Sequence, residues 1–427
     1  MINVVIIGGG WAGCSAALAA RQSGARVVVL ERTDMLLGTG LVGGIMRNNG
    51  RYSATEELIA MGGGRIFEAI DCNLLHREVD FPGHAHAGLY NVGTMEPIIR
   101  RLLRDNEIEL RFGARVTAVR RDGGQIKAVS GKQAGEPFEI AGDVFIETTG
   151  TAGPPAVCNK FGNGCAMCVL RCHSFGGRVS VAEKAGVAEM NGQKGAQTGA
   201  VSGSCKLHKE SLSPELCLQL DSTGVVVVPV PAQSRQQGKL ALKACQQYAL
   251  DDFEENVIVL DTGHAKLMTP YYPLEQLRQI PGFENARFED PYAGGIGNSV
   301  RYIGMSPRDD SLKVDGIDNL YCAGEKAGLL VGHTEAICTG TLAGHNAVRY
   351  IRRQDPLIIS DALCIGDAIR LVRVEMREKG ELGKKFTFSG SVLFDRMKSK
   401  GLYTTDRAAI AARVERAGLI DIFSPHR

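Results

Sequence analysis

The sequence contains no apolar stretch that approaches the roughly 18 residues needed to span a bilayer. Its first residues also lack a basic region ahead of an apolar run, which a secretory signal would require. The formal net charge is only +2, so charge alone gives no reason to expect tight nonspecific binding to nucleic acid or to an anionic membrane. We therefore expect a cytoplasmic protein that has no membrane partner.

Repeats and low-complexity tracts are also absent. A chain of 427 residues with 44% hydrophobic and 22% charged residues has the composition of a globular protein, and it can hold two or three folded units. In a reducing compartment, its 12 cysteines are expected to be thiols, metal ligands or redox centres rather than structural disulfides.

The most informative stretch covers residues 2–32, INVVIIGGGWAGCSAALAARQSGARVVVLER. An apolar run ends at a glycine turn, a helix of small residues follows, and a second apolar run ends at an acid, which is the pattern of a dinucleotide-binding βαβ unit. Gly8 permits the tight turn, Gly10 lets the backbone approach a pyrophosphate, and Gly13 lets helix and strand pack closely. The helix N-terminus then favours a bound diphosphate.

Glu31 lies near the offset of about 20 residues at which an acid hydrogen-bonds a ribose hydroxyl and repels a 2′-phosphate. The expected ligand is therefore FAD or NAD. A strand-to-helix turn without any ligand is the alternative, and the complete strand, helix, strand and acid pattern disfavours it. The cofactor contacts predicted in this unit are Gly8, Gly10, Trp11, Ala12, Gly13, Glu31 and Arg32.

The glycine-rich segment 38–44 comes next, and it is either a plain loop or a backbone that approaches the middle of the cofactor. Residues 95–104 have helical spacing, and residues 109–112, 116–120, 126–129 and 143–147 are predicted to be short strands. The last of these strands ends in a Thr-Thr-Gly turn.

These features resemble the FAD-dependent oxidoreductases with a glutathione-reductase-like FAD domain. The resemblance is carried by the glycine turn with Glu31, the segment MEPIIRRLLRDNEIELRFGARVTAV at 95–119, the turn TTGT at 148–151 and the segment NLYCAGE at 319–325. The segment GHTEAICTGTLAG at 332–344 is similar to the tRNA-uridine-modifying flavoproteins and the folate/FAD-dependent tRNA methyltransferase. The likeness implies FAD but does not identify a substrate.

By that likeness, Val116 would lend its backbone to the adenine, and Gly324 and Glu325 would hold the ribityl-phosphate side, although relatives often carry Asp in place of Glu325. The helix opening near Thr334 would point its dipole at the flavin ring and stabilise negative charge there. Gly43, Gly44, Thr149 and Gly150 complete the predicted cofactor contacts. For Gly340 and Gly344, close helix packing and direct cofactor contact are equally favoured.

Four cysteines, Cys158, Cys165, Cys168 and Cys172, crowd the run CNKFGNGCAMCVLRC, where an even spread of 12 cysteines would place only about 0.4. Four thiolates on one loop favour a [4Fe-4S] cluster. Zinc is less favoured, and a redox dithiol or plain buried cysteines are further alternatives. Because no second G-x-G-x-x-G appears between residues 173 and 318, an external electron donor or acceptor is expected.

His333, Glu335 and Cys338 lie in the segment expected to face the flavin, so they are the candidate catalytic residues. His333 could transfer a proton near neutral pH, whereas Cys338 could be a nucleophile only if its pKa were lowered. A helix cap and simple packing are the alternative roles.

We therefore predict an α/β fold with a Rossmann-like FAD-binding domain built on a central parallel sheet, formed by residues 1–157 and 295–355. An insertion at 158–294 would hold the cysteine loop and an α+β substrate domain, and residues 356–427 would be helical. Lys and Arg outnumber Asp and Glu in that last region, which is compatible with binding RNA, but a solvated tail or a contact in a homo-oligomer is favoured.

The favoured function is an FAD-dependent oxidoreductase that passes electrons between an iron-sulfur cluster and the flavin and acts on a small molecule. The alternatives are flavin-dependent tRNA or rRNA modification and a redox-sensing or electron-carrying flavoprotein.

Overall fold

The computed structural model describes the chain except for a few internal stretches and the two ends. The described residues are 2–150, 179–194, 197–198, 200–201, 205–235, 238, 240, 246–268, 272–289, 300–301, 304–380 and 382–425. No helix in these ranges combines the length and the apolar character that crossing a bilayer demands.

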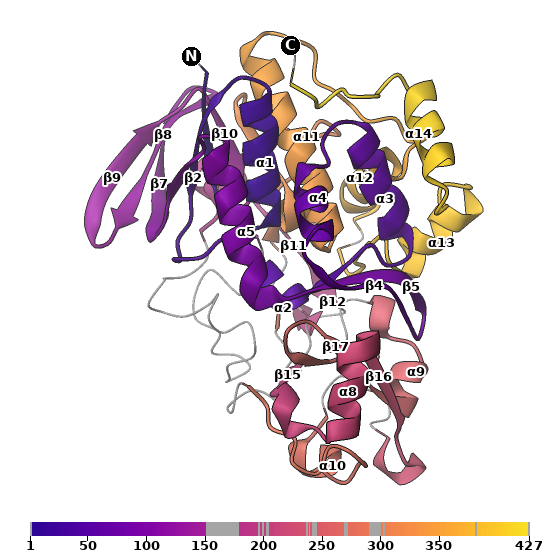
Figure 1. Ribbon diagram of the computed structural model, residues 1–427. Helices are drawn as coiled ribbons and strands as arrows, with labels where there is room; N and C mark the ends of the chain where they lie inside the picture. The colour runs from indigo at the N-terminus through magenta and orange to yellow at the C-terminus, as the bar shows by residue number, and fades with distance from the viewer. Residues whose placement is uncertain are drawn as a thin grey trace.

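A five-stranded parallel sheet has the strand order β21-β10-β1-β2-β6 and lies in the upper part of the molecule in Figure 1, where β10 and β2 are labelled. Its strands are β1 (Asn3–Ile7), β2 (Arg26–Leu30), β6 (Glu109–Arg111), β10 (Val144–Glu147) and β21 (Leu320–Cys322). The apolar run of β1 is buried on both faces, as expected for an inner strand of a parallel sheet. The predicted Rossmann-like α/β class is confirmed.

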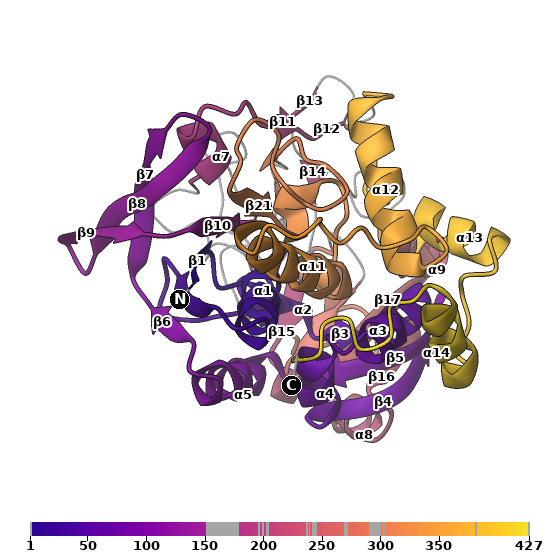
Figure 2. The same ribbon diagram turned by 90° about the horizontal axis from the view of Figure 1, so that it is seen from above.

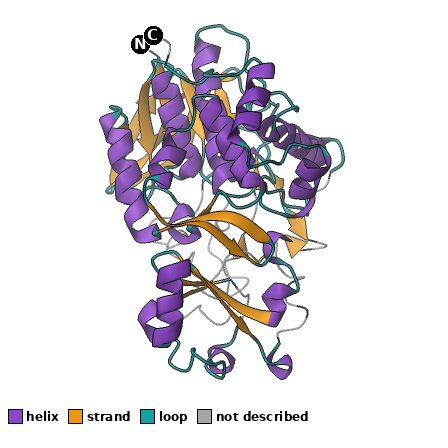
Figure 3. Cartoon of the chain, turned by 45° about the vertical axis from the view of Figure 1, so that its right-hand side comes forward, coloured by secondary structure: helices purple, strands orange, loops and turns teal. Residues whose placement is uncertain are grey.

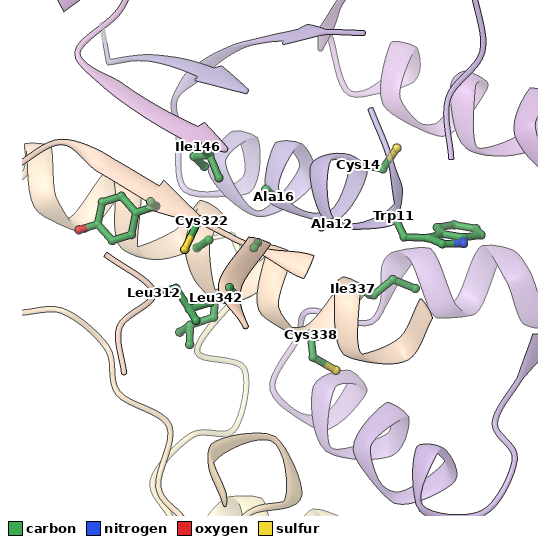
Figure 4. Close-up of a cluster of buried hydrophobic side chains, with 14 of the residues drawn as sticks. Trp11, Ala12, Cys14, Ala16, Ile146, Leu312, Cys322, Ile337, Cys338 and Leu342 are labelled. Atoms are coloured by element: carbon green, nitrogen blue, oxygen red, sulfur yellow. The ribbon is translucent and has the colours of Figure 1, made fainter. Parts of the chain in front are cut away.

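Two helices that lie far apart in the sequence cover one face of this sheet: α1 (Trp11–Gln22) and α11 (His333–Ile351). They lie side by side in Figure 2, and Figure 4 shows their apolar side chains meeting. A Cβ atom at Gly340 would lie 2.2 Å from the Ala12 carbonyl oxygen, and one at Gly344 would lie 2.2 Å from that of Ala16. Close packing therefore explains both glycines, because a larger side chain at either position would force the two helices apart.

An antiparallel three-stranded sheet, β7 (Ala114–Asp122), β8 (Gln125–Gln133) and β9 (Glu136–Ala141), extends from the edge of the domain. Helix α5 (Val92–Asp105) precedes it. These elements include the predicted helix at 95–104 and the predicted strands at 116–120 and 126–129.

Within the predicted insertion, residues 205–267 include an antiparallel sheet, β15-β18-β17-β16, which lies below the helices and the central sheet in Figure 3. Its strands are β15 (Cys205–Leu207), β16 (Val225–Pro229), β17 (Asn256–Asp261) and β18 (Ala265–Leu267), and helix α8 (Pro214–Thr223) packs on it. A second small sheet, β3 (Ile45–Met46), β4 (Leu74–Phe81) and β5 (His84–Tyr90), shares an apolar cluster with this insertion, in which Phe81 and Leu89 lie with Phe253 and Leu260.

The C-terminal region consists of helices α12 (Cys364–Arg377), α13 (Ser391–Ser399) and α14 (Arg407–Arg416). It is packed rather than solvated, because the buried carboxylate of Glu57 in α3 (Gly50–Ala60) accepts hydrogen bonds from Cys364 N at 2.9 Å and Ile365 N at 3.2 Å and pairs with Arg413 at 2.8 Å. This corrects the expectation of a solvated tail.

The remaining described elements are short. They are α2 (Gly40–Gly43), α4 (Arg65–Asp71), α7 (Val181–Lys184), α9 (Asp252–Glu255), α10 (Leu274–Leu277), β11 (Met190–Asn191), β12 (Gln193–Lys194), β13 (Gln197–Thr198), β14 (Ala200–Val201), β19 (Val300–Arg301), β20 (Gly304–Met305), and the 3₁₀ turns η2 (Lys209–Ser211), η3 (Ala232–Ser234), η5 (Gln246–Tyr248) and η6 (Gly324–Ala327).

Candidate functional site

In the glycine turn and the first turn of α1, Gly8, Gly9 and Gly13 are crowded and Gly10 is open; a Cβ at Gly9 would lie 2.7 Å from Leu36 Cδ2. Gly8 has a φ of 108°, and a Cβ there would lie 2.4 Å from the Thr148 carbonyl oxygen. A Cβ at Gly13 would lie 1.9 Å from the carbonyl oxygen of Gly8. At Gly10, by contrast, the nearest described atom would be the Leu37 carbonyl oxygen at 4.0 Å. The space beside Gly10 is where the fingerprint places a pyrophosphate.

The carboxylate of Glu31 lies against this turn. Its Oε2 accepts a hydrogen bond from Gly9 N at 2.7 Å, and its Oε1 accepts from Thr33 N at 2.9 Å and from the Thr33 hydroxyl at 3.0 Å. Arg32 beside it is half-buried, and Val116 at the start of β7 is buried. Glu31 therefore both fixes the turn and supplies an acceptor at the position predicted for the ribose.

The N-termini of α1 and α11 lie next to each other. The rings of Trp11 and His333, the first residues of the two helices, have centroids 6.3 Å apart. Thr334 is buried in the first turn of α11, and a Cβ at Gly324 would lie 3.0 Å from the Cβ of Ala12. Because each helix N-terminus carries unpaired N-H groups, the pair is suited to a ligand with negatively charged groups.

The glycine-rich segment 38–44 closes over these two N-termini. Gly40 lies under the Trp11 indole, and its carbonyl accepts a hydrogen bond from the Tyr90 hydroxyl at 2.9 Å. Gly43 contacts the His333 ring so closely that a Cβ would fall 1.6 Å from Cε1, and Gly44, with a φ of 83°, packs on Thr262. This placement favours the cofactor-proximal interpretation of the segment over that of a plain loop.

The arrangement fits an FAD molecule. Gly10 leaves open space where the described chain could accept a diphosphate, and Gly38 packs beside it. The Trp11 indole closes one side of this space, with its N-H edge against Gly40 and its ring edge-on to that of Tyr90. Thr149, whose hydroxyl donates to Glu147 at 2.9 Å, and Gly150, with a φ of 67°, end the neighbouring strand.

An acid that sequence reasoning missed sits at this strand end. Glu147 is fully buried and accepts hydrogen bonds from Val181 N and Ala182 N, each at 2.8 Å. The buried ammonium of Lys326 lies 3.4 Å from it. The sequence pattern could have indicated this acid, because Glu147 comes at the end of an apolar run just as Glu31 does. Glu325 beside Lys326 is half-buried.

Glu335, a predicted catalytic residue, belongs to a buried polar network. Its carboxylate pairs with Arg51 Nε at 3.2 Å and accepts from the Thr387 hydroxyl at 2.7 Å and from Phe388 N at 2.8 Å. These bonds hold the C-terminal region against the start of α11. The placement favours a positioning role for Glu335, while His333 is half-exposed beside the glycine segment and stays the stronger catalytic candidate.

A nucleophilic role for Cys338 requires a lowered thiol pKa, and the structure gives the opposite. Its thiol is buried in α11, and burial, together with the nearby charge of Glu335, raises its pKa well above the usual range for a thiol. A thiolate is the nucleophilic form, so the geometry places Cys338 in the packing of the helix instead.

The network continues through residues that the sequence did not single out. Arg51 donates to the Asn48 side-chain oxygen at 3.1 Å, the Asn48 amide lies 2.9 Å from His84 Nδ1, and His84 Nε2 lies 3.0 Å from the Gln247 carbonyl oxygen. It therefore joins the glycine-turn domain, the insertion and the C-terminal region. The loop that supplies Asn48 has positive φ at both flanking residues, 62° at Arg47 and 55° at Asn49. Such strain persists only where surrounding contacts impose it.

The burial of His84 gives a prediction about pH. Burial lowers its pKa to about 3 from the ordinary 6.5, so the folded protein holds it neutral while the unfolded chain takes up a proton. The His84 contribution to the free energy of unfolding should therefore fall as pH drops from about 6.5 toward 3, by up to about 1.4 kcal/mol per pH unit. Urea unfolding at several pH values measures this slope. It should flatten in His84→Gln and persist in His86→Gln, and an equal slope in both variants would contradict the assignment.

The predicted cluster ligands Cys158, Cys165, Cys168 and Cys172 lie outside the described residues. Within the described ranges, no group of three or more His, Cys, Asp or Glu side chains could hold a metal ion. The cysteines that are described are free thiols, as expected: Cys14, Cys72, Cys205, Cys217, Cys322, Cys338 and Cys364.

Comparisons with known proteins identify two matching families. Residues 3–153 match the FAD dependent oxidoreductase family, and residues 246–355 match the family of Glucose inhibited division protein A. The tRNA uridine 5-carboxymethylaminomethyl modification enzyme MnmG of Desulfotalea psychrophila is 38% identical over 91 residues, which are 20% of this chain and 13% of that enzyme. The enzyme of the same name from Nitratiruptor is 33% identical over 99 residues, 23% of this chain and 15% of that enzyme.

The fold also matches a solved structure. GidA of Aquifex aeolicus superimposes with a TM-score of 0.65, covering 97% of this chain and 76% of that one at 15% identity, which shows a shared fold. The sequence matches and the fold together confirm the resemblance stated above. The chain is therefore similar to the FAD-dependent oxidoreductases over residues 3–153, and it resembles the GidA and MnmG proteins in fold and over part of its sequence.

Proposed function

We propose that this chain is an FAD-dependent enzyme that modifies a uridine in tRNA. The observation that carries the proposal is the sequence match to enzymes named for that activity, found on a chain whose glycine turn and paired helix N-termini fit FAD. The match favours RNA over the small molecule that we expected from the sequence. The matched segment covers 13% of the first relative's length, so we assign the substrate of that relative to this chain as a proposal.

FAD would supply hydride or electron transfer, and the chain's own groups would bind and orient it. Gly10 and the first turn of α1 would hold the diphosphate, and Glu31 would accept a hydrogen bond from the ribose. The N-terminus of α11, beginning at His333, would favour negative charge on the flavin ring. His333 would transfer a proton, since its ring is half-exposed at that point.

The C-terminal helices give limited support for binding phosphates. Their basic side chains are largely engaged by carboxylates: Arg396 and Lys400 with Asp367, Lys398 with Asp395, Arg407 with Glu56, and Arg413 with Glu57. RNA would therefore have to contact other cations of the chain as well.

Binding and modification of an unmodified tRNA transcript test the proposal. Filter binding by the FAD-loaded protein should weaken about tenfold or more between about 50 and 200 mM salt, because even two phosphate contacts give that dependence. The RNA is then incubated with the FAD-loaded protein, a reductant and the small-molecule fraction of a cell extract, which supplies the group to be added, and mass measurement of its digested uridines should show a mass change that requires FAD. Binding that does not depend on salt, together with unchanged uridine masses, would contradict the proposal.

A second proposal concerns electron supply. The four clustered cysteines are suited to an iron-sulfur cluster that would pass electrons to the flavin, and the only support for it is their spacing in the sequence. Iron and acid-labile sulfide should copurify under nitrogen with the unaltered protein and be lost in Cys165→Ala. Flavin-loaded protein without iron or sulfide would refute the cluster while leaving the FAD site unaffected.

A further inference from the structure

The insertion supports the glycine-rich segment 38–44 from the side away from the predicted flavin site. Lys206 on β15 and Lys266 on β18 are directly opposite each other in the antiparallel pair. Their strand neighbours Leu207 and Leu267 are buried in the core of the insertion. Since successive side chains point to opposite faces of a strand, the two lysines point away from that core. They point toward α2, which lies just above β15 in Figure 1.

Both ammonium groups donate to consecutive backbone carbonyls of the segment. Lys206 Nζ donates to the Leu41 carbonyl at 3.4 Å, and Lys266 Nζ donates to the carbonyls of Val42 and Gly43. Lys266 is only 6% exposed, and hydrogen bonds from a charged donor are stronger where water is largely excluded. The insertion therefore fixes the end of the segment mainly through Lys266.

A third contact docks the insertion in the same place. Thr262 lies in the turn between β17 and β18, and a Cβ at Gly44 would lie 2.4 Å from its Cγ2 atom. The Thr262 carbonyl also accepts a hydrogen bond from Val92 N, in the first residue of α5, at 3.1 Å. Because this contact does not involve either lysine, the insertion should stay folded and close to the segment when one lysine is replaced.

The other side of the segment contacts the predicted cofactor site along its length. Leu37, which precedes it, donates its N-H to the Gly9 carbonyl in the glycine turn at 2.8 Å. The middle of the segment lies against the Trp11 indole, and Gly43 lies against the His333 ring. The segment therefore touches the insertion on one side and the N-termini of α1 and α11 on the other, so a displacement of its carbonyls would alter the surroundings of the flavin.

We propose that Lys266, supported by Lys206, is a positioning residue for FAD and couples the docking of the insertion to cofactor binding. Its hydrogen bonds hold the segment in the conformation that meets the two helix N-termini. Without them, part of the binding free energy of FAD goes into ordering the segment. Because such coupling is reciprocal, bound FAD must in turn strengthen the docking of the insertion. The inference rests on the FAD site of the proposed function, and it requires neither tRNA nor turnover.

The first measurement is the dissociation constant of FAD, obtained by equilibrium dialysis of flavin-free protein. Lys266→Met should raise this constant about tenfold, within the range of about 5- to 150-fold that is typical of coupled sites. Lys266→Arg keeps the charge and the donors, so it should bind FAD nearly as tightly as the unaltered protein. Arg278→Met is the matched control: it removes a cation that donates to the Ala286 carbonyl at 3.1 Å within the insertion, and it should leave the constant unchanged. Lys206→Met, which loses one long hydrogen bond, should give a smaller rise and covers the case in which Lys266→Met does not fold.

The second measurement is amide hydrogen exchange in peptides that cover β17 and β18, with and without saturating FAD. Bound FAD should slow this exchange in the unaltered protein and in Arg278→Met, and it should have little effect in Lys266→Met, a difference that a purely structural lysine would not produce. Equal FAD affinity in the unaltered protein and both lysine-to-methionine variants, or exchange that FAD does not change in the unaltered protein, would overturn the inference and leave the FAD site standing. Failure of the unaltered protein to bind FAD would contradict the proposed function as well.

Discussion

Replacing Gly10 with valine is expected to abolish FAD binding and leave the fold intact. The backbone at Gly10 has a φ of −68°, which any residue adopts, and an added Cβ would meet its nearest described neighbour only at 4.0 Å. The valine side chain would instead fill the space predicted for the diphosphate. Flavin released by denaturing the purified variant should fall to background, while its melting temperature stays close to that of the flavin-free parent protein.

Gly13→Val is the matched control, and it should destabilise the fold itself, whereas Gly10→Val should only block FAD binding. Its Cβ would lie 1.9 Å from the Gly8 carbonyl oxygen, so the strand and the helix would have to separate. Overpacking of this kind costs about 1–3 kcal/mol or more. Full FAD occupancy in Gly10→Val would show that the diphosphate lies elsewhere, and unfolding of Gly10→Val would show that the space beside it is already filled.

Arg51→Met should destabilise the protein by about 3–5 kcal/mol, because it leaves the carboxylate of Glu335 buried without its cationic partner. The side chain of Glu335 is fully buried and that of Arg51 is 5% exposed. Urea unfolding measures the loss in the free energy of unfolding. The double variant Arg51→Met, Glu335→Leu should recover much of it, since both charges are then gone.

Arg120→Met provides the comparison for an exposed ion pair. Arg120 and Glu139 are 57% and 53% exposed, so the variant should cost less than about 1 kcal/mol. A loss of that small size in Arg51→Met would mean that water reaches Glu335 and that the buried network does not hold α11 in place.

The parts of the fold that the sequence predicts are those in which neighbours along the chain decide the structure. The βαβ unit at residues 2–32 is contiguous, so its apolar runs, glycines and terminal acid all appear in one stretch. The inner strands are also visible as apolar runs, because a parallel sheet buries both faces. The short hairpins of β7 to β9 carry their turn residues between them.

The parts that the sequence does not predict depend on distant partners. The pair of Arg51 with Glu335 joins residues 284 positions apart, and no local pattern distinguishes these two from other charged residues. The predicted position of Glu335 near a flavin suggested catalysis, whereas its three partners place it in a structural network. The same limit applies to Cys338, because burial sets its pKa.

The most direct test of the FAD site is a titration of flavin-free protein with FAD, followed by the fluorescence of Trp11. This is the only tryptophan in the chain, and it forms the first residue of α1 beside the open glycine. Flavin absorbs where indole emits, so binding at this site should quench the emission strongly and saturably, with no saturable quenching in Gly10→Val. Unchanged emission at full flavin loading, or identical quenching in both proteins, would contradict the account.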